Sequence, residues 1–157
     1  MNTLIAERLM QYEPGEVVIK AITRLLMEDG ELLRVDANER SITHCLASHL
    51  KAELPYLHVD CEYNRDGIEP KRIRGISQET SSNDTEAKTV FPDIIAHIRG
   101  TDINYLVIEV KKSTNRTDHA IDIKKLLKYK AELRYEYALF LELATGGKPG
   151  VTSVQWV

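Results

Sequence analysis

The segment from Phe91 to Ser113 limits the possible folds most, because two strand-forming runs flank a short polar stretch. Residues 91–98 and 105–111 are rich in β-branched and aromatic side chains, which favour strands. The residues between them, 99–104, contain the Gly, Asp and Asn that typically form turns. We therefore predict a β-hairpin that belongs to the central sheet of the protein.

Three charged residues interrupt the apolar character of this hairpin. Asp93 lies early in the first strand, and Glu109 and Lys111 end the second. Side chains alternate between the two faces of a strand, so Glu109 and Lys111 project from the same face. If the strands pair as a hairpin, Asp93 lies across from them. We therefore expect two carboxylates and an ammonium group to converge at one end of a sheet.

Such a trio suits the hydrolysis of a phosphodiester. Mg²⁺ and Mn²⁺ prefer octahedral shells of oxygen ligands and retain several waters, so a pair of carboxylates matches their chemistry. A bound metal ion polarises a phosphoryl oxygen and lowers the pKa of a bound water. Lys111 is placed to orient that water or to stabilise the charge that grows on the phosphate. We expect Mg²⁺, or Mn²⁺, as the cofactor.

The same residues resemble the motif of a known family. Pro92-Asp93, followed by Glu109-Val110-Lys111 on the next strand, is similar to the motif of the PD-(D/E)XK nuclease superfamily, which includes restriction endonucleases and Holliday-junction resolvases. Of the four (D/E)xK tripeptides in the chain, only this one ends an apolar strand and follows a Pro-Asp pair. The resemblance implies a nuclease in which Asp93 and Glu109 bind the metal and Lys111 is catalytic.

Glu39 has two candidate roles. Residues 36–54 are predicted to form a helix, and Asp36 and Glu39 have the spacing of a capping box with Asp36 as N-cap. Glu39 also leads the stripe that should face the sheet, which contains Ile42, Leu46, His49 and Leu50. Many superfamily members carry a Glu on the first core helix that reaches the metal, directly or through a water, and Glu39 is the position that resembles it. Both roles stay open at this point.

The other elements follow from periodicity and from turn residues. Two helices are predicted in the first 30 residues, broken at Glu13-Pro14-Gly15, and the second buries Val18, Ile22 and Leu25. After the helix over 36–54 we predict a strand over 57–63, a polar loop over 75–88, the hairpin, a helix over 118–134, and strands over 137–143 and 151–157. The buried stripe expected for the helix over 118–134 is Ala120, Ile123, Leu127 and Ala131.

The predicted order from about residue 36 to residue 143 is one helix, three strands, one helix and one strand. This order matches the αβββαβ core of the superfamily. The expected fold class is therefore α/β, with a mixed central β-sheet flanked by helices, a restriction-endonuclease-like core and extra N-terminal helices. With 157 residues the chain is long enough for one core. We predict a single domain, with residues 1–35 as a helical extension and 36–157 as the core.

Basic residues indicate where a nucleic acid would bind. The net charge is −3, but residues 111–130 carry seven Lys or Arg and only two Asp. The residues expected to hold a phosphate backbone are Lys71, Arg72 and Arg74 in a short patch and Lys124, Lys125 and Lys128 in the helix over 118–134. A charged strand edge and a solvated helix face are the alternative explanations. Residues 125–129 are similar to the Gln-Leu-x-x-Tyr signature of one nuclease branch, with Lys in place of Gln, and Tyr129 is expected to pack at the edge of the core.

The composition is that of an ordinary soluble protein, with 43% hydrophobic and 29% charged residues. No apolar run approaches the ~20 residues of a membrane span, and the N-terminus lacks the apolar region of a signal peptide. Cys45 and Cys61 are too few for a disulfide scaffold. We expect a cytoplasmic protein without a membrane partner.

These observations predict a Mg²⁺-dependent nuclease that hydrolyses DNA phosphodiester bonds. The expected partner is DNA, and cutting both strands would require a homodimer, the commonest assembly. Three alternatives stay open. They are a catalytically silent nuclease-fold subunit that binds nucleic acid or has a regulatory role, a junction resolvase, and an unrelated α/β protein in which the motif is accidental.

Overall fold

The computed structural model describes residues 2–63, 65–66, 69–70, 72–74, 87–89 and 91–157. In chain order its elements are α1 (Thr3–Leu9), α2 (Gly15–Glu28), α3 (Gly30–Arg34), α4 (Glu39–Glu53), β1 (His58–Cys61), β2 (Arg65–Asp66), β3 (Glu69–Pro70), β4 (Arg72–Arg74), β5 (Ala87–Thr89), β6 (Ile94–His97), β7 (Asn104–Lys112), α5 (His119–Leu133), β8 (Tyr137–Ala144) and β9 (Gly150–Trp156). The loop predicted over 75–88 falls outside the described residues, except for its last two residues in β5.

β7 is the central strand of a five-stranded mixed sheet of order β1-β6-β7-β8-β9. β6 and β7 pair antiparallel, with Ile94 opposite Ile108, so the predicted hairpin is confirmed. β8 runs parallel to β7, while β1 and β9 pair antiparallel with β6 and β8 at the two edges. β7 is buried along nearly all of its length, as its apolar run requires.

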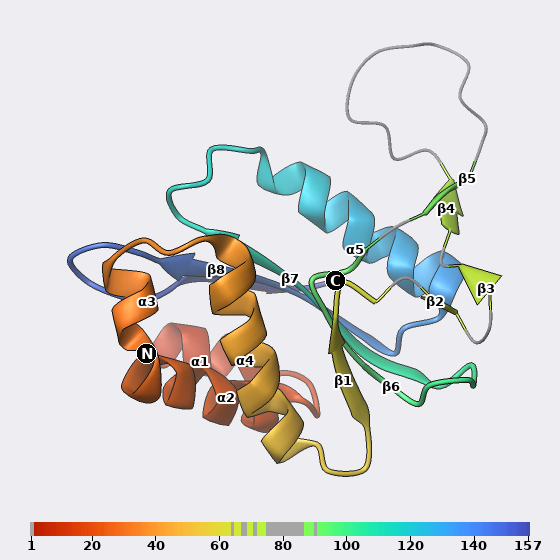
Figure 1. Ribbon diagram of the computed structural model, residues 1–157, viewed down its shortest axis with the longest axis horizontal. Helices are drawn as coiled ribbons and strands as arrows, with labels where there is room; N and C mark the ends of the chain where they lie inside the picture. The colour runs from red at the N-terminus through yellow and green to blue at the C-terminus, as the bar shows by residue number, and fades with distance from the viewer. Residues whose placement is uncertain (1, 64, 67–68, 71, 75–86, 90) are drawn as a thin grey trace.

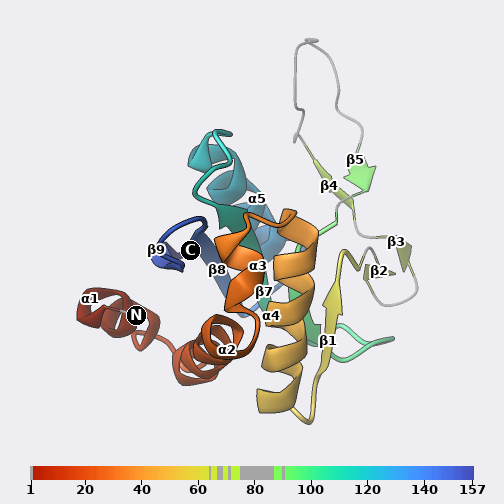
Figure 2. The same cartoon turned by 60° about the vertical axis from the view of Figure 1, so that its left-hand side comes forward.

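Helices cover both faces of the sheet (Figure 1), which confirms the predicted α/β class. Figure 2 shows α5 on one face and α2 and α4 on the other. Alternate residues of β7 supply the two halves of the core: Ile108 packs with the cluster under α2 and α4, and Val107 packs with the cluster under α5. The N-terminal helices share the first cluster with the sheet. No helix among the described residues is long and apolar enough to cross a bilayer.

Asn38, rather than Asp36, caps α4. Asn38 Oδ1 accepts a hydrogen bond from the Ser41 N–H at 2.8 Å. Asp36 has a left-handed backbone with φ 51°, and its carboxylate pairs with Lys112 Nζ at 2.9 Å. The predicted capping box of Asp36 and Glu39 is therefore wrong. An Asn next to the helix satisfies its first N–H groups as well as an Asp would, so Asp36 is available to hold the end of β7.

The buried stripe predicted for α5 is also wrong in most positions. The fully buried residues of α5 are Leu126, Tyr129 and Leu133. Ile123 is half-buried, whereas Ala120, Leu127 and Ala131 are exposed. The helix is rotated about its axis relative to the prediction because the charged side chains of its first half face the sheet. There they form ion pairs with charged residues of β7. Tyr129, expected at the edge of the core, packs in the core, where it is 1% exposed and belongs to the cluster under α5.

Gly15 offers a test of how α1 and α2 meet. A Cβ on Gly15 would lie 2.0 Å from the carbonyl oxygen of Leu9 and 2.6 Å from its carbonyl carbon. We expect Gly15→Ala to push α1 away from α2 and to lower the free energy of unfolding by about 1–3 kcal/mol. Denaturant unfolding followed by circular dichroism measures the change.

Gly30→Ala is the matched control, since Gly30 also begins a helix but a Cβ there would meet none of the described residues within 4 Å. It should leave stability unchanged or slightly raised. Equal losses in both variants would contradict the close approach as the cause.

Candidate active site

β7 extends beyond the end of its neighbour β6, and this overhang positions the candidate site. The β6 ladder covers only the first part of β7 and leaves residues 109–112 beyond it. In this overhang the Val110 N–H donates to Asp93 Oδ2 at 2.8 Å, and the Lys112 N–H donates to Glu39 Oε2 at 2.9 Å. A buried backbone N–H needs an acceptor. Two carboxylates from distant parts of the chain are therefore fixed at the end of β7.

The two acids of the predicted hairpin lie together. Continuing the ladder from the Ile94–Ile108 pair by one residue places Asp93 opposite Glu109. Glu109 is only 3% exposed, and both carboxylates line the same small cavity of about 130 Å³. The structure therefore brings together the residues that the sequence identifies as the acid pair.

Glu39 reaches the same cavity from α4, on the opposite face of the sheet from α5. Besides the Lys112 N–H, its Oε2 accepts a hydrogen bond from Asn115 Nδ2 at 3.4 Å. Its side chain is thus turned toward the end of β7, which is the direction that a role at the acid pair requires.

The ion-pair partner of Lys111 is an acid on α5 and not an acid of the hairpin. It is 2% exposed, and its Nζ lies 2.9 Å from Asp122 Oδ2 on α5. The cation next to Glu109 is Lys125, also on α5, whose Nζ lies 3.0 Å from Glu109 Oε2 and 3.0 Å from Asp122 Oδ1. Lys111, Asp122, Lys125 and Glu109 thus form a continuous chain of alternating charge between α5 and β7.

Burial shifts the protonation equilibria of the acid pair. It raises the pKa of Asp93 to about 6, although the Val110 N–H and Lys125 oppose the shift. It raises the pKa of Glu109 to about 8, with a further increase from the nearby Asp93 charge and an opposing effect of Lys125. Burial alone would lower the pKa of Lys125, but Glu109 and Asp122 raise it above its ordinary value. A cation that joined the two carboxylates would relieve their repulsion.

The acid pair has the chemistry of a site for a hard divalent cation. Among the described residues, Glu109 Oε1 is one of two buried side-chain atoms without a hydrogen-bond partner. Such an atom is costly unless a ligand satisfies it. The described residues contain no cluster of three or more His, Cys, Asp or Glu arranged as a ready-made metal site. Mg²⁺ typically binds through one or two carboxylates and keeps its remaining waters, so a pair of carboxylates fits this ion.

Asp122 and Lys125 line the cavity and form ion pairs there, which the sequence patterns did not predict. Asp122, Lys125 and Tyr129 recur at spacings of three and four, which puts them on one face of a helix. The apolar residues of α5 predict that another face of the helix, the one with Ile123 and Leu127, is buried. Because the helix is rich in lysine, the sequence also predicts that Lys125 contacts DNA. The signal for the correct face is charge: buried Glu109 and Lys111 need partners of opposite charge, and Lys125 and Asp122 supply them from one face of α5.

The predicted nucleic-acid-binding residues lie in different surroundings. Lys71 lies outside the described residues, and for Arg72 and Arg74 the structure describes the backbone of β4 only. On α5, Lys124 is exposed and Lys128 is half-buried, so both face outward at least in part. Lys125 is turned toward Glu109 instead.

Comparison of the chain with models of protein families, with curated proteins and with solved structures finds no match.

The Lys111–Asp122 pair can be tested through stability. Asp122→Ala leaves the buried Lys111 ammonium without its acid, and removal of one member of a buried ion pair is strongly destabilising. We expect the free energy of unfolding to fall by about 3 kcal/mol, as measured by urea unfolding in a buffer with a metal chelator.

Adding Lys111→Met to Asp122→Ala should restore most of the loss, because no buried charge is then left unpaired. Glu31→Ala is the control, since it removes an exposed ion pair with Arg34 and should produce no measurable change. A double variant no more stable than Asp122→Ala would show that the loss has another origin.

Proposed function

We propose that the protein is a metal-dependent nuclease that hydrolyses DNA phosphodiester bonds at the end of β7. The observation that carries the proposal is the pair of Asp93 and Glu109 in one small cavity, where Glu109 is buried and its Oε1 has no hydrogen-bond partner among the described residues. A purely structural role leaves this costly arrangement unexplained, whereas a divalent cation would use both the charge and the open oxygen.

The proposal includes the fold family. The elements α4, β1, β6, β7, α5 and β8 follow one another in the order helix, three strands, helix and strand, with β2 to β5 inserted between β1 and β6. Asp93 directly before β6 and Glu109 and Lys111 near the end of β7 are arranged as the resemblance to the PD-(D/E)XK motif would require. Element order and motif positions together support a restriction-endonuclease-like core.

Each site residue has a role in this proposal. Asp93 and Glu109 would bind Mg²⁺ or Mn²⁺, and Glu39 would contact the ion directly or through a water. Such an ion supplies a Lewis acid and a water of lowered pKa. Lys111, held by Asp122, stabilises the negative charge that develops on the phosphate oxygens. Lys125 balances the charge of Glu109, and its second bond, to Asp122, would hold it in place when Glu109 binds the ion.

Binding of the nucleic acid is assigned to the basic residues around the site. Lys124 and Lys128 project from α5, whose inner face carries Asp122 and Lys125. A phosphate backbone that lies along α5 would therefore be held next to the acid pair, mainly by charge and without reading the sequence.

Metal binding and cleavage give the direct test. We expect isothermal titration calorimetry to detect Mn²⁺ binding to the native protein and to find at least a ~100-fold loss of affinity in Asp93→Asn. The Asn keeps an acceptor for the Val110 N–H while it removes the charge. Glu28→Gln, an exposed acid on α2, is the control and should bind Mn²⁺ normally.

Cleavage is then followed on supercoiled, linear and branched DNA with Mn²⁺, for the native protein and for Glu109→Gln. Nicking that disappears in Glu109→Gln supports the nuclease. Equal activity in both would indicate a contaminating enzyme. Metal binding without cleavage of any of the three DNAs would favour a silent nucleic-acid-binding subunit.

Lys125 should compete with the metal ion for Glu109, because its ammonium group lies 3.0 Å from Glu109 Oε2. We expect Lys125→Met to raise the affinity for Mn²⁺ by about tenfold, the effect of removing one nearby like charge. Lys128→Met, on the same helix, should leave the affinity unchanged. If Lys125→Met binds Mn²⁺ more weakly than the native protein, Lys125 supports the site instead of competing for it.

A further inference from the structure

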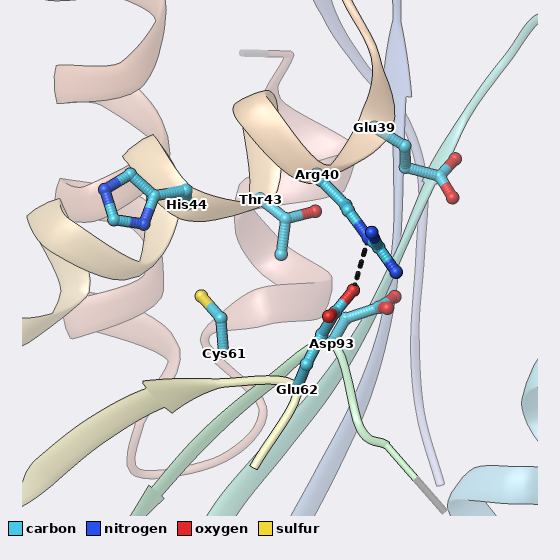
Figure 3. Close-up of a pocket in the computed structure, with 7 residues that line it drawn as sticks. All are labelled: Glu39, Arg40, Thr43, His44, Cys61, Glu62 and Asp93. Carbon is cyan, nitrogen blue, oxygen red and sulfur yellow. Dashed lines mark hydrogen bonds and ion pairs between the residues drawn. The ribbon is translucent and has the colours of Figure 1, made fainter.

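A second cavity, of about 330 Å³, adjoins the acid pair (Figure 3). From α4 it is lined by Glu39, Arg40, Thr43 and His44, and from the other side by Cys61 and Glu62 at the end of β1 and by Asp93. Glu39 and Asp93 also line the smaller cavity that contains Glu109. The larger cavity therefore lies next to the proposed site, where a part of the substrate beside the reacting phosphate would reach it.

An ion pair between Arg40 and Glu62 crosses this cavity (Figure 3). Arg40 Nε donates to Glu62 Oε1 at 2.6 Å, and the two side chains are 84% and 43% exposed. Pairs this exposed contribute little to stability. Arg40 is also the second residue of α4, near the positive end of the helix dipole, where a cation is unfavourable. The stability of the fold does not account for an arginine at this position.

The backbone conformation of Glu62 is also unusual. Glu62 has φ 50°, in the left-handed region that residues other than Gly rarely adopt. Its N–H donates to the carbonyl oxygens of Pro92 and Asp93 at 3.0 and 3.3 Å. Glu62 is thus tied to the segment that carries the first acid of the proposed site, and its partner Arg40 lines the same cavity as that acid.

The chemistry of the lining fits a nucleotide. A guanidinium group matches the geometry of a phosphate and binds it in bidentate fashion. The Thr43 hydroxyl can bond to the edge of a base, and the exposed His44 ring at the rim can stack on one. The volume lies at the lower end of the ~300–1,000 Å³ typical of small-ligand pockets. The lining also carries the carboxylates of Glu39, Glu62 and Asp93, whose repulsion of a phosphate a cation at the neighbouring acid pair would offset. With such a cation in place, a single nucleotide fits the other features.

We infer that this pocket receives one unpaired nucleotide of the substrate, adjacent to the phosphodiester bond that is cut. Arg40 leaves Glu62 to bind the phosphate of that nucleotide, and Thr43 and His44 contact its base. The inference rests on the proposed function, from which it takes the class of ligand. A base that stays paired and stacked in a duplex cannot enter a pocket between a helix and a strand. The preferred substrate therefore has a single-stranded region at the cut, such as a flap or a single strand.

Binding without cleavage tests this inference. The probe is a fluorescein-labelled DNA single strand of about 15 nucleotides, in the range of sites used by single-strand binders, compared with a duplex of the same length. Fluorescence anisotropy in Ca²⁺ buffer gives the affinities of the native protein and of Arg40→Met, Glu62→Gln and Thr43→Val. The control pair is Arg24→Met and Glu28→Gln, which removes an exposed Arg–Glu pair of α2 with an Nε–Oε1 distance of 3.0 Å.

The two members of the Arg40–Glu62 pair should act in opposite directions. We expect Arg40→Met to weaken binding of the single strand about tenfold, as loss of a charged hydrogen bond does. Glu62→Gln should tighten it a few-fold, because Arg40 is released from its competitor. Thr43→Val, which keeps the shape of the side chain, should weaken it a few-fold, and the native protein should prefer the single strand to the duplex. The control variants should bind as the native protein does.

Failure of this inference differs from failure of the nuclease proposal. If Glu62→Gln weakens binding, if Arg40→Met has no effect, or if the duplex binds as tightly as the single strand, the pocket does not hold an unpaired nucleotide, even when the protein cuts DNA. If the opposite effects of Arg40→Met and Glu62→Gln appear but no DNA is cut with Mn²⁺, the pocket assignment stands and the nuclease proposal fails.

Discussion

The overhang of β7 beyond β6 is the feature on which the site depends. A strand that outruns its neighbour leaves N–H groups without ladder carbonyls, and those groups must find other acceptors when they are buried. Here the acceptors are the carboxylates of Asp93 and Glu39. The end of the central strand is therefore the point at which the segment before β6 and the start of α4 become fixed. Glu109 projects from the same end of β7 toward α5.

Charges buried at this overhang then determine how α5 packs. An uncompensated ion in a protein interior costs several kcal/mol, and Glu109 and Lys111 are both almost completely buried. α5 supplies an ion-pair partner for each, Lys125 for Glu109 and Asp122 for Lys111. This requirement selects the face of α5 that meets the sheet in its first half, while Leu126, Tyr129 and Leu133 provide apolar packing in its second half.

The sequence predicts what local patterns determine and misses what depends on distant partners. The hairpin, the buried stripe of α4 and the meeting of Asp93 with Glu109 follow from period-two and period-3.6 patterns within short segments. The buried face of α5 cannot be predicted in this way, because it carries charged residues. Their burial is explained only by their ion pairs with β7, which lies outside the local pattern. The cap of α4 escapes prediction for a similar reason, since Asp36 is occupied by Lys112, far along the chain.

Asp93 and Glu39 line both cavities. The hydrogen bonds of their carboxylates explain how the same two side chains can face a ligand in each cavity. A carboxylate offers two oxygens and about four lone pairs. The backbone bonds use Oδ2 of Asp93 and Oε2 of Glu39, and within the described part of the chain Oδ1 and Oε1 are left for a ligand. Holding the acids by one oxygen each fixes their orientation before any ligand arrives, and preorganised acids lose little entropy when they bind. The overhang of β7 that supports the fold is thus the same feature that would prepare the site for a cation on one side and a nucleotide on the other.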